Sequence, residues 1–252
     1  MKDQSLISDI NRLKEEKNAV ILAHVYQDSK IQDIADFVGD SLALSKKAVD
    51  ASAEIIVFCG VSFMAETAHI LNPDKTVLLP RVEAGCKLAE MATIDKLKEQ
   101  KEKHPDAAVV SYVNSSAMIK AFSDVCCTSS NALKIVNAMP QDTILFLPDK
   151  NLGSYVAEKS DKKIILWDGY CYVHENIKSD TINKLQKQHP SAEIIVHPEC
   201  PKEVRDLADF IGGTGHMSKY VKDSKTDEFI VGTEVNFSYR LKKDNPTKNF
   251  YS

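Results

Sequence analysis

The sequence contains no apolar run long enough to span a membrane, and its N-terminus lacks the apolar core of a signal peptide. We therefore expect a cytoplasmic protein without membrane association. The net charge of -4 and a pI near 6.0 exclude a general attraction to nucleic acid, so any affinity for an anion must come from local groups. No Ser-His-Asp order and no nucleophile elbow is present, which argues against acyl transfer.

The chain contains an internal repeat, which appears when three segments are placed in one register. The segments contain VILAHVYQ, VVSYVNSS and IIVHPECP, and equivalent residues within them are separated by 88 and 85 positions. Five sets of landmarks share these two offsets, which makes a chance agreement improbable. The sets are Asp36, Asp124 and Asp209; His24, Tyr112 and His197; Tyr26, Asn114 and Glu199; Ser41, Ser129 and Thr214; and Phe58, Phe146 and Val231.

Each repeat alternates strands with helices, a pattern typical of parallel βαβ units with right-handed crossovers. The runs KTVLLP and KKIILW predict a third strand in the first two repeats, and KNFYS is its counterpart in the last. We predict an α/β fold of three homologous three-layer αβα domains with parallel sheets around a pseudo-threefold axis, the third domain being truncated at its C-terminus. The predicted domains cover residues 1–86, 87–171 and 172–252.

Polar side chains follow the first strand of each predicted domain, where open parallel sheets bind their ligands. The equivalent pairs are His24 and Tyr26, Tyr112 and Asn114, and His197 and Glu199. Residues two apart in an extended segment share a face, so each pair can contact one substrate. A lone histidine at a strand end is usually structural, but the repetition argues against that here. Two imidazoles, a phenol and a carboxylate suit proton transfer, and the middle pair suits neutral hydrogen bonding.

Three turns, VGDSLALS, CCTSSNAL and GGTGHMSK, place Ser41, Ser129 and Thr214 just before predicted helices. Helix capping is the ordinary explanation for any one of these hydroxyls. Three at equivalent positions favour an anion site instead, because helix N-termini and hydroxyl groups hold phosphate or carboxylate without Lys or Arg.

Two of the six cysteines occupy equivalent places. Cys86 and Cys171 each follow the third strand of a repeat and lie 85 positions apart. One thiolate from each of three domains would hold an iron–sulfur cluster and leave one iron open as a Lewis acid. The same spacing predicts the third cysteine a few residues beyond Ser252, and this sequence does not contain it.

The other cysteines are weaker candidates. Cys59 lies inside a predicted strand and is expected in the core, and Cys126 and Cys127 are expected in a turn that approaches a helix. Cys200 has no counterpart in the other repeats. It is a rival metal ligand that we rank below Cys86 and Cys171.

The chain resembles the quinolinate synthase A family, the iron–sulfur enzymes of de novo NAD synthesis. The similarity runs through ILAHVYQDSKIQDIADFVGDS, YVNSS, CCTSSNA, PDKNLGSYVAEK, IIVHPECPKEVRDLADFIGGTG and VGTEVNFSYRLKK, which together cover nearly the entire chain. The resemblance implies three α/β domains around a central 4Fe-4S cluster. It also implies condensation of iminoaspartate with dihydroxyacetone phosphate, with loss of phosphate and water, and functional coupling to an enzyme that produces iminoaspartate.

The resemblance also implies roles for the matched residues. Cys86 and Cys171 would be two of the three cluster ligands, and Glu199 and Tyr26 acid/base groups, with His197 also placed in the catalytic set. The substrate-binding residues would be His24, Ser41, Tyr112, Asn114, Ser129 and Thr214. Two departures from the family pattern are Gly213, where many relatives carry Ser, and the missing final segment with its cysteine.

Two alternatives stay open at this point. One is a metal-free enzyme similar to triose-phosphate isomerase that uses Glu199 as a base. The other is a truncated, cluster-poor member that binds small phosphates or dicarboxylates without turnover. The absence of the third cysteine favours the second alternative over the first.

Overall fold

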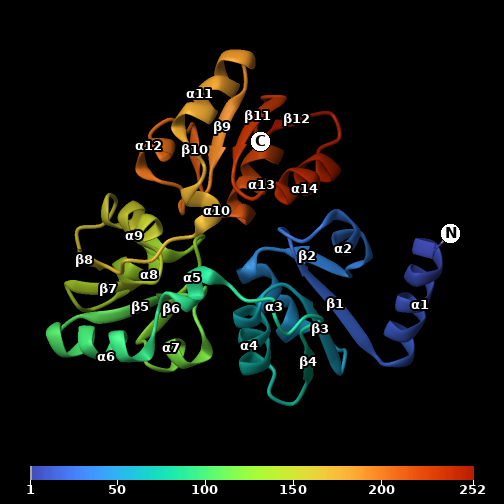
Figure 1. Cartoon of the computed structure of the whole chain (residues 1–252), viewed down its shortest axis with the longest axis horizontal. Helices are drawn as coiled ribbons and strands as arrows, with labels where there is room; N and C mark the ends of the chain where they lie inside the picture. The colour runs from blue at the N-terminus through green and yellow to red at the C-terminus, as the bar shows by residue number, and fades with distance from the viewer. Residues whose placement is uncertain (1) are drawn as a thin grey trace. The chain divides into compact units, whose positions relative to one another are not determined.

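The structure is a computed structural model that describes residues 2–252, with side chains from Gln4 onward. It contains three four-stranded parallel sheets, ordered β2-β1-β3-β4, β6-β5-β7-β8 and β10-β9-β11-β12 (Figure 1). The strands are β1 Ala19–His24, β2 Phe37–Gly39, β3 Ile55–Cys59, β4 Thr76–Leu78, β5 Ala108–Tyr112, β6 Val125–Cys127, β7 Thr143–Leu147, β8 Lys163–Leu166, β9 Glu193–Val196, β10 Phe210–Ile211, β11 Glu228–Gly232 and β12 Asn249–Tyr251. One order recurring three times confirms the predicted α/β class.

Helices connect the strands of every sheet, as parallel strands require. Those of the first repeat are α1 Lys2–Glu16, α2 Ser29–Ile34, α3 Ser41–Asp50 and α4 Ser62–Leu71. Those of the middle repeat are α5 Lys87–Glu90, α6 Ile94–Lys103, α7 Ala117–Ala121, α8 Ala132–Ala138 and α9 Lys150–Ala157. Those of the third are α10 Tyr172–Glu175, α11 Ser179–Gln188, α12 Lys202–Arg205, α13 Thr214–Asp223 and α14 Asn236–Asp244.

The middle sheet shows why each repeat forms three layers. Successive residues of a strand face opposite sides of its sheet. Tyr112 and Val110 of β5 pack with residues of α8 and α9, whereas the intervening face of β5 and β7 packs with α6 and α7. Both faces of the sheet are therefore covered by helices, and the two central strands, β5 and β7, are mostly apolar.

Each sheet also has a short edge strand, β2, β6 or β10, which the sequence patterns did not predict. The expectation that Cys126 and Cys127 lie in a turn is therefore wrong, because both belong to β6. Two or three residues are too few to show an alternating pattern, so pairing with the neighbouring strand decides their conformation.

The repeated aspartates explain how these edge strands begin. Each aspartate accepts a hydrogen bond through Oδ2 from the main-chain N–H of a residue in the first strand, and its own N–H donates to the carbonyl of that same residue. We call this reciprocal pair the aspartate bracket. The three brackets join Asp36 to Ile21, Asp124 to Val109 and Asp209 to Ile194, with carboxylate contacts of 2.8, 2.7 and 2.8 Å. The three repeated aspartates therefore have a structural role.

The chain separates into two compact units, Met1–Gly85 and Cys86–Ser252. The first unit contains one sheet and the second contains the other two. The division at residues 86 and 171 and the pseudo-threefold axis stay predictions. Across residues 2–252, no helix has the length and apolar character needed to cross a membrane.

We expect Asp124→Ala to lower the free energy of unfolding by about 1 kcal/mol, because one bracket loses its charge-assisted hydrogen bond. The melting temperature should fall by about 2 to 4 °C. Asp106→Ala is the control, since that side chain is exposed and lies outside the bracket. Equal melting temperatures for the two variants would contradict a stabilising role for the bracket.

Candidate active site

Cys86 and Cys171 occupy equivalent positions within the Cys86–Ser252 unit. Each is the N-cap of a short helix, α5 or α10, and each packs partly buried against one apolar cluster of the middle sheet. Burial raises the pKa of both thiols, while the backbone amides two and three residues further along lower it. A sulfur placed at a helix N-terminus is suited to act as a thiolate ligand once a metal offsets its burial.

The buried carboxyl group of Asp149 binds the main chain at Cys171. Asp149 is fully buried, and its Oδ1 caps α9 by accepting the N–H of Leu152 at 2.7 Å. Its Oδ2 accepts the N–H of Cys171 at 3.0 Å. Burial and the charge of Glu199 raise the pKa of Asp149 well above its ordinary value. The loop that carries Cys171 is therefore fixed directly to the start of α9.

Glu199 is the carboxylate at the centre of this unit. It is 2% exposed, and its Oε2 lies 2.7 Å from His174 Nδ1 and 3.6 Å from His197 Nδ1. Burial acts to raise the pKa of Glu199, but the imidazoles of His174 and His197 and hydrogen bonds from His174 and Tyr112 outweigh burial, so the pKa is lowered. The side chain is an ionised carboxylate held by imidazole and phenol donors.

The sulfur of Cys171 completes a donor set with His174 and Glu199. One ligand atom from each of these residues lies within 4.8 Å of the others. His174 Nε2 contacts Thr233 Oγ1 at 2.8 Å. Because an ionised carboxylate only accepts, Nδ1 of His174 directs its proton toward Glu199, and Nε2 shares a hydrogen bond with the Thr233 hydroxyl. The set offers sulfur, nitrogen and oxygen to a metal or a polar substrate.

The histidines at the strand ends have a shared orientation. The main-chain N–H of Tyr26 donates to His24 Nδ1, and that of Glu199 donates to His197 Nδ1, both at 3.3 Å. Nε2 of His197 lies 3.3 Å from Ser129 Oγ, within reach of a hydrogen bond.

The Ser/Thr turns of the middle and third repeats meet at Ser129 and Gly213. A Cβ atom added to Gly213 would lie 2.6 Å from Ser129 Oγ and 2.7 Å from Ser130 Oγ, so glycine leaves room for both hydroxyls. Thr214, the first residue of α13, follows directly and is buried. Other residues occupy the N-cap positions of the three helices: Asp40 in α3, Asn131 in α8 and Gly213 in α13. Ser41, Ser129 and Thr214 are therefore not the N-cap residues.

Two buried oxygen atoms point to a missing partner. Glu199 Oε1 and Asn114 Oδ1 are inaccessible to solvent and make no hydrogen bond to the residues that the structure describes. Buried polar atoms are usually satisfied, so these two atoms indicate where a polar ligand would bind. Both belong to the predicted site.

Within the Cys86–Ser252 unit, the structure brings Tyr112, His197 and Glu199 into contact, with Ser129 beside His197. His24, Tyr26 and Ser41 belong to the Met1–Gly85 unit, at the end of β1, in the next turn and at the start of α3. Their participation in a shared site stays a prediction.

The sequence patterns missed His174, Thr233, Asp149 and Asn151. A usable signal exists for His174, which follows Cys171 by three positions and so shares one face of a helical turn with it. Nothing comparable marks Thr233, whose partner His174 is 59 positions away. Asp149 and Asn151 lie in the family-like block PDKNLGSYVAEK, but their contacts come from other strands and loops.

The rival cysteines belong to strands or to the buried core. Cys59 ends β3, and Cys127 is fully buried in β6. Cys200 is also fully buried, where its thiol contacts the carbonyl of Gly232 at 3.4 Å and packs in the core of the third sheet. Burial raises the pKa of both Cys127 and Cys200. Cys200 is therefore a core residue, consistent with its lower rank as a ligand.

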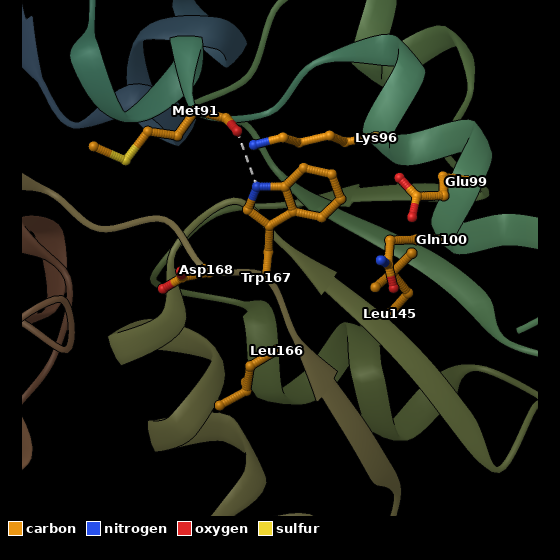
Figure 2. A pocket seen from close by; sticks show the side chains of 8 residues that line it. All are labelled: Met91, Lys96, Glu99, Gln100, Leu145, Leu166, Trp167 and Asp168. Carbon is orange, nitrogen blue, oxygen red and sulfur yellow. Dashed lines mark hydrogen bonds between the residues drawn. The ribbon is translucent and has the colours of Figure 1, made fainter. Parts of the chain in front are cut away.

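A pocket of about 320 Å³ lies on the other face of the middle sheet (Figure 2). Its wall includes Trp167, whose indole N–H donates to the carbonyl of Met91 at 3.0 Å. Leu145 of this wall belongs to the cluster under α6 and α7, whereas Cys86 and Cys171 pack on the α8 and α9 side. No predicted site residue lines this pocket.

Known proteins share sequence with nearly the whole chain. A family model described as Quinolinate synthetase A protein matches residues 8–252. Quinolinate synthase of Clostridium kluyveri is 54% identical over 252 residues, covering 100% of this chain and 83% of the relative. Quinolinate synthase 2 of Methanosarcina acetivorans is 52% identical over 251 residues, covering 100% of this chain and 81% of the relative. The chain belongs to the quinolinate synthetase A family.

Proposed function

We propose that the protein condenses iminoaspartate with dihydroxyacetone phosphate and closes the pyridine ring to give quinolinate, with release of phosphate and water. The name quinolinate synthase, carried by relatives 51% and 54% identical over the chain, supports this reaction. Both substrates are small and carry anionic groups, which the hydroxyl, imidazole and amide donors of the site can hold by hydrogen bonds.

One observation carries the proposal. A sulfur, an imidazole and a fully buried carboxylate converge within 4.8 Å, and the carboxylate retains one oxygen without a hydrogen-bond partner among the described residues. A carboxylate in this position can take a proton from a substrate carbon or hydroxyl and return it later. Buried carboxylate oxygens usually have a hydrogen-bond partner, so this oxygen marks a place for a polar ligand.

The residues of the chain have the following proposed roles. Glu199 moves protons, and its two imidazole neighbours together with Tyr112 hold its charge in place. The imidazole of His197, with Ser129 and Thr214, supplies hydrogen bonds for a phosphate or carboxylate group. Asn114, together with Tyr112, orients the substrate through neutral hydrogen bonds. His24, Tyr26 and Ser41 are proposed to add an imidazole, a second acid/base group and a hydroxyl from the first repeat.

Cys86 and Cys171 fit a 4Fe-4S cluster as two of its thiolate ligands, because both sulfurs lie at helix N-termini and amides favour their ionised form. Such a cluster supplies a Lewis acid at an open iron, which polarises a substrate oxygen. The repeat spacing predicts the third ligand beyond Ser252. We also propose that the protein works in the cytoplasm and receives iminoaspartate from the enzyme that produces it.

We expect Cys86→Ser and Cys171→Ser each to abolish retention of iron and sulfide after anaerobic reconstitution, because each removes one thiolate. Cys59→Ser is the matched control, since Cys59 ends a strand in the other unit. Iron and sulfide analysis with the visible absorption spectrum measures the result. Equal iron loss in all three variants would reject Cys86 and Cys171 as the ligands, whereas a colourless unsubstituted protein would favour the cluster-poor binding protein.

For Glu199→Gln we expect unchanged iron content but quinolinate formation reduced by roughly 10²-fold or more, because the amide keeps the shape of the side chain and cannot accept a proton. The control is Glu203→Gln, an exposed carboxylate four positions away on α12. Quinolinate assayed per iron-loaded protein decides the question. Undiminished production by Glu199→Gln would remove this residue from the catalytic set.

A further inference from the structure

Arg205 is an almost fully buried cation that joins the middle and third repeats. It ends α12, and only 2% of the residue is exposed. Its Nη1 donates to the main-chain carbonyls of Asn151 at 2.7 Å and Cys200 at 3.1 Å. Its Nη2 donates to Ser154 Oγ at 3.2 Å and Glu158 Oε1 at 2.9 Å. One planar group therefore connects α9 with the loop that follows β9.

The side chain of Asn151 makes a second connection between the same elements. Its Nδ2 donates to the main-chain carbonyl of Glu199 at 3.1 Å and to Glu175 Oε2 at 2.8 Å. The carbonyls of Glu199 and of the next residue, Cys200, are thus both held by donors from outside their loop. Among the described residues, Asn151 and Arg205 bind the main chain of this loop, and neither donates a hydrogen bond to the Glu199 carboxylate.

We propose that Arg205 is a positioning residue for Glu199, acting through the main chain of the loop at residues 197–201 with Asn151 as its partner. This inference rests on the proposed acid/base role of Glu199. A short side chain buried among two imidazoles cannot correct a displaced backbone by changing rotamer, so the loop's position fixes where the carboxylate lies.

A contribution to protein stability does not by itself explain why Arg205 is buried here. The charged partner of Arg205 is Glu158, whose side chain is 36% exposed, and the Nε atom of Arg205 is buried without a hydrogen-bond partner in the described chain. Burying a guanidinium against carbonyl oxygens and one partly hydrated carboxylate recovers little of the desolvation cost. The fork geometry, which reaches two carbonyls and two side chains at once, is the property that Lys cannot reproduce.

The test compares Arg205→Lys, which keeps the charge, with two controls. Glu158→Gln removes the ion pair but leaves the carbonyl contacts, and Lys202→Ala changes an exposed residue of the same helix. We expect Arg205→Lys to lower kcat by about 10- to 100-fold with KM changed less than about twofold and iron content unchanged, because a displaced acid/base group slows chemistry more than binding. Both controls should keep kcat within about twofold of the unsubstituted protein.

Asn151→Ala provides an independent variant if Arg205→Lys folds poorly. It removes the side-chain contact with the Glu199 carbonyl and retains the Arg205 contact to its own carbonyl. It should lower kcat in the same direction with unchanged iron content. Unchanged kcat in Asn151→Ala and Arg205→Lys, or a loss fully explained by lost iron, would overturn the proposal.

Combination with Glu199→Gln separates this inference from the proposed function. If Arg205 acts through Glu199, adding Arg205→Lys to Glu199→Gln should produce little further loss, because coupled residues are not additive. Full additivity of the two losses would overturn the positioning role. If Glu199→Gln alone keeps full activity, the proposed function of Glu199 has failed, whatever Arg205→Lys does.

Discussion

The Cys86–Ser252 unit depends on keeping an ionised carboxylate in its interior, and no Lys or Arg of the described chain forms an ion pair with it. Moving a carboxylate out of water is costly unless hydrogen bonds and opposite charge replace its hydration. For Glu199 that replacement comes from two imidazoles and the phenol of Tyr112. These donors belong to different strands and helices, so the carboxylate stays buried only while the middle and third repeats are correctly packed together.

In each repeat, the residues that build the sheet differ from the residues proposed to act in the site. Each sheet uses the same strand order and the same aspartate bracket. The residues just beyond the first strands differ among the repeats, from imidazole and phenol to amide and carboxylate. A single scaffold therefore presents different functional groups from equivalent places, which explains why a repeat was useful for locating them.

Much of the architecture was predictable because β-branched runs and constant offsets are local signals. The strand ends at Tyr112 and Glu199 followed from the repeat, and the structure places these two side chains in contact. The edge strands were not predictable, since two or three residues carry no period. The contacts of His174 with Thr233 and of Arg205 with Asn151 span 59 and 54 positions and break the repeat. Only folding reveals such pairs.

The contacts of Asp149 link the start of α9 to the Cys171 segment of the candidate site. Its two oxygens hold the start of α9 and the backbone of Cys171, while Asn151 in the first turn of α9 holds the backbone of Glu199. The thiol-bearing segment and the carboxylate-bearing segment therefore share one anchor. A small shift of α9 would move the Cys171 thiol and the Glu199 carboxylate in the same direction and preserve the distance between them. Thermal motion of the helix therefore need not change the spacing that the chemistry requires.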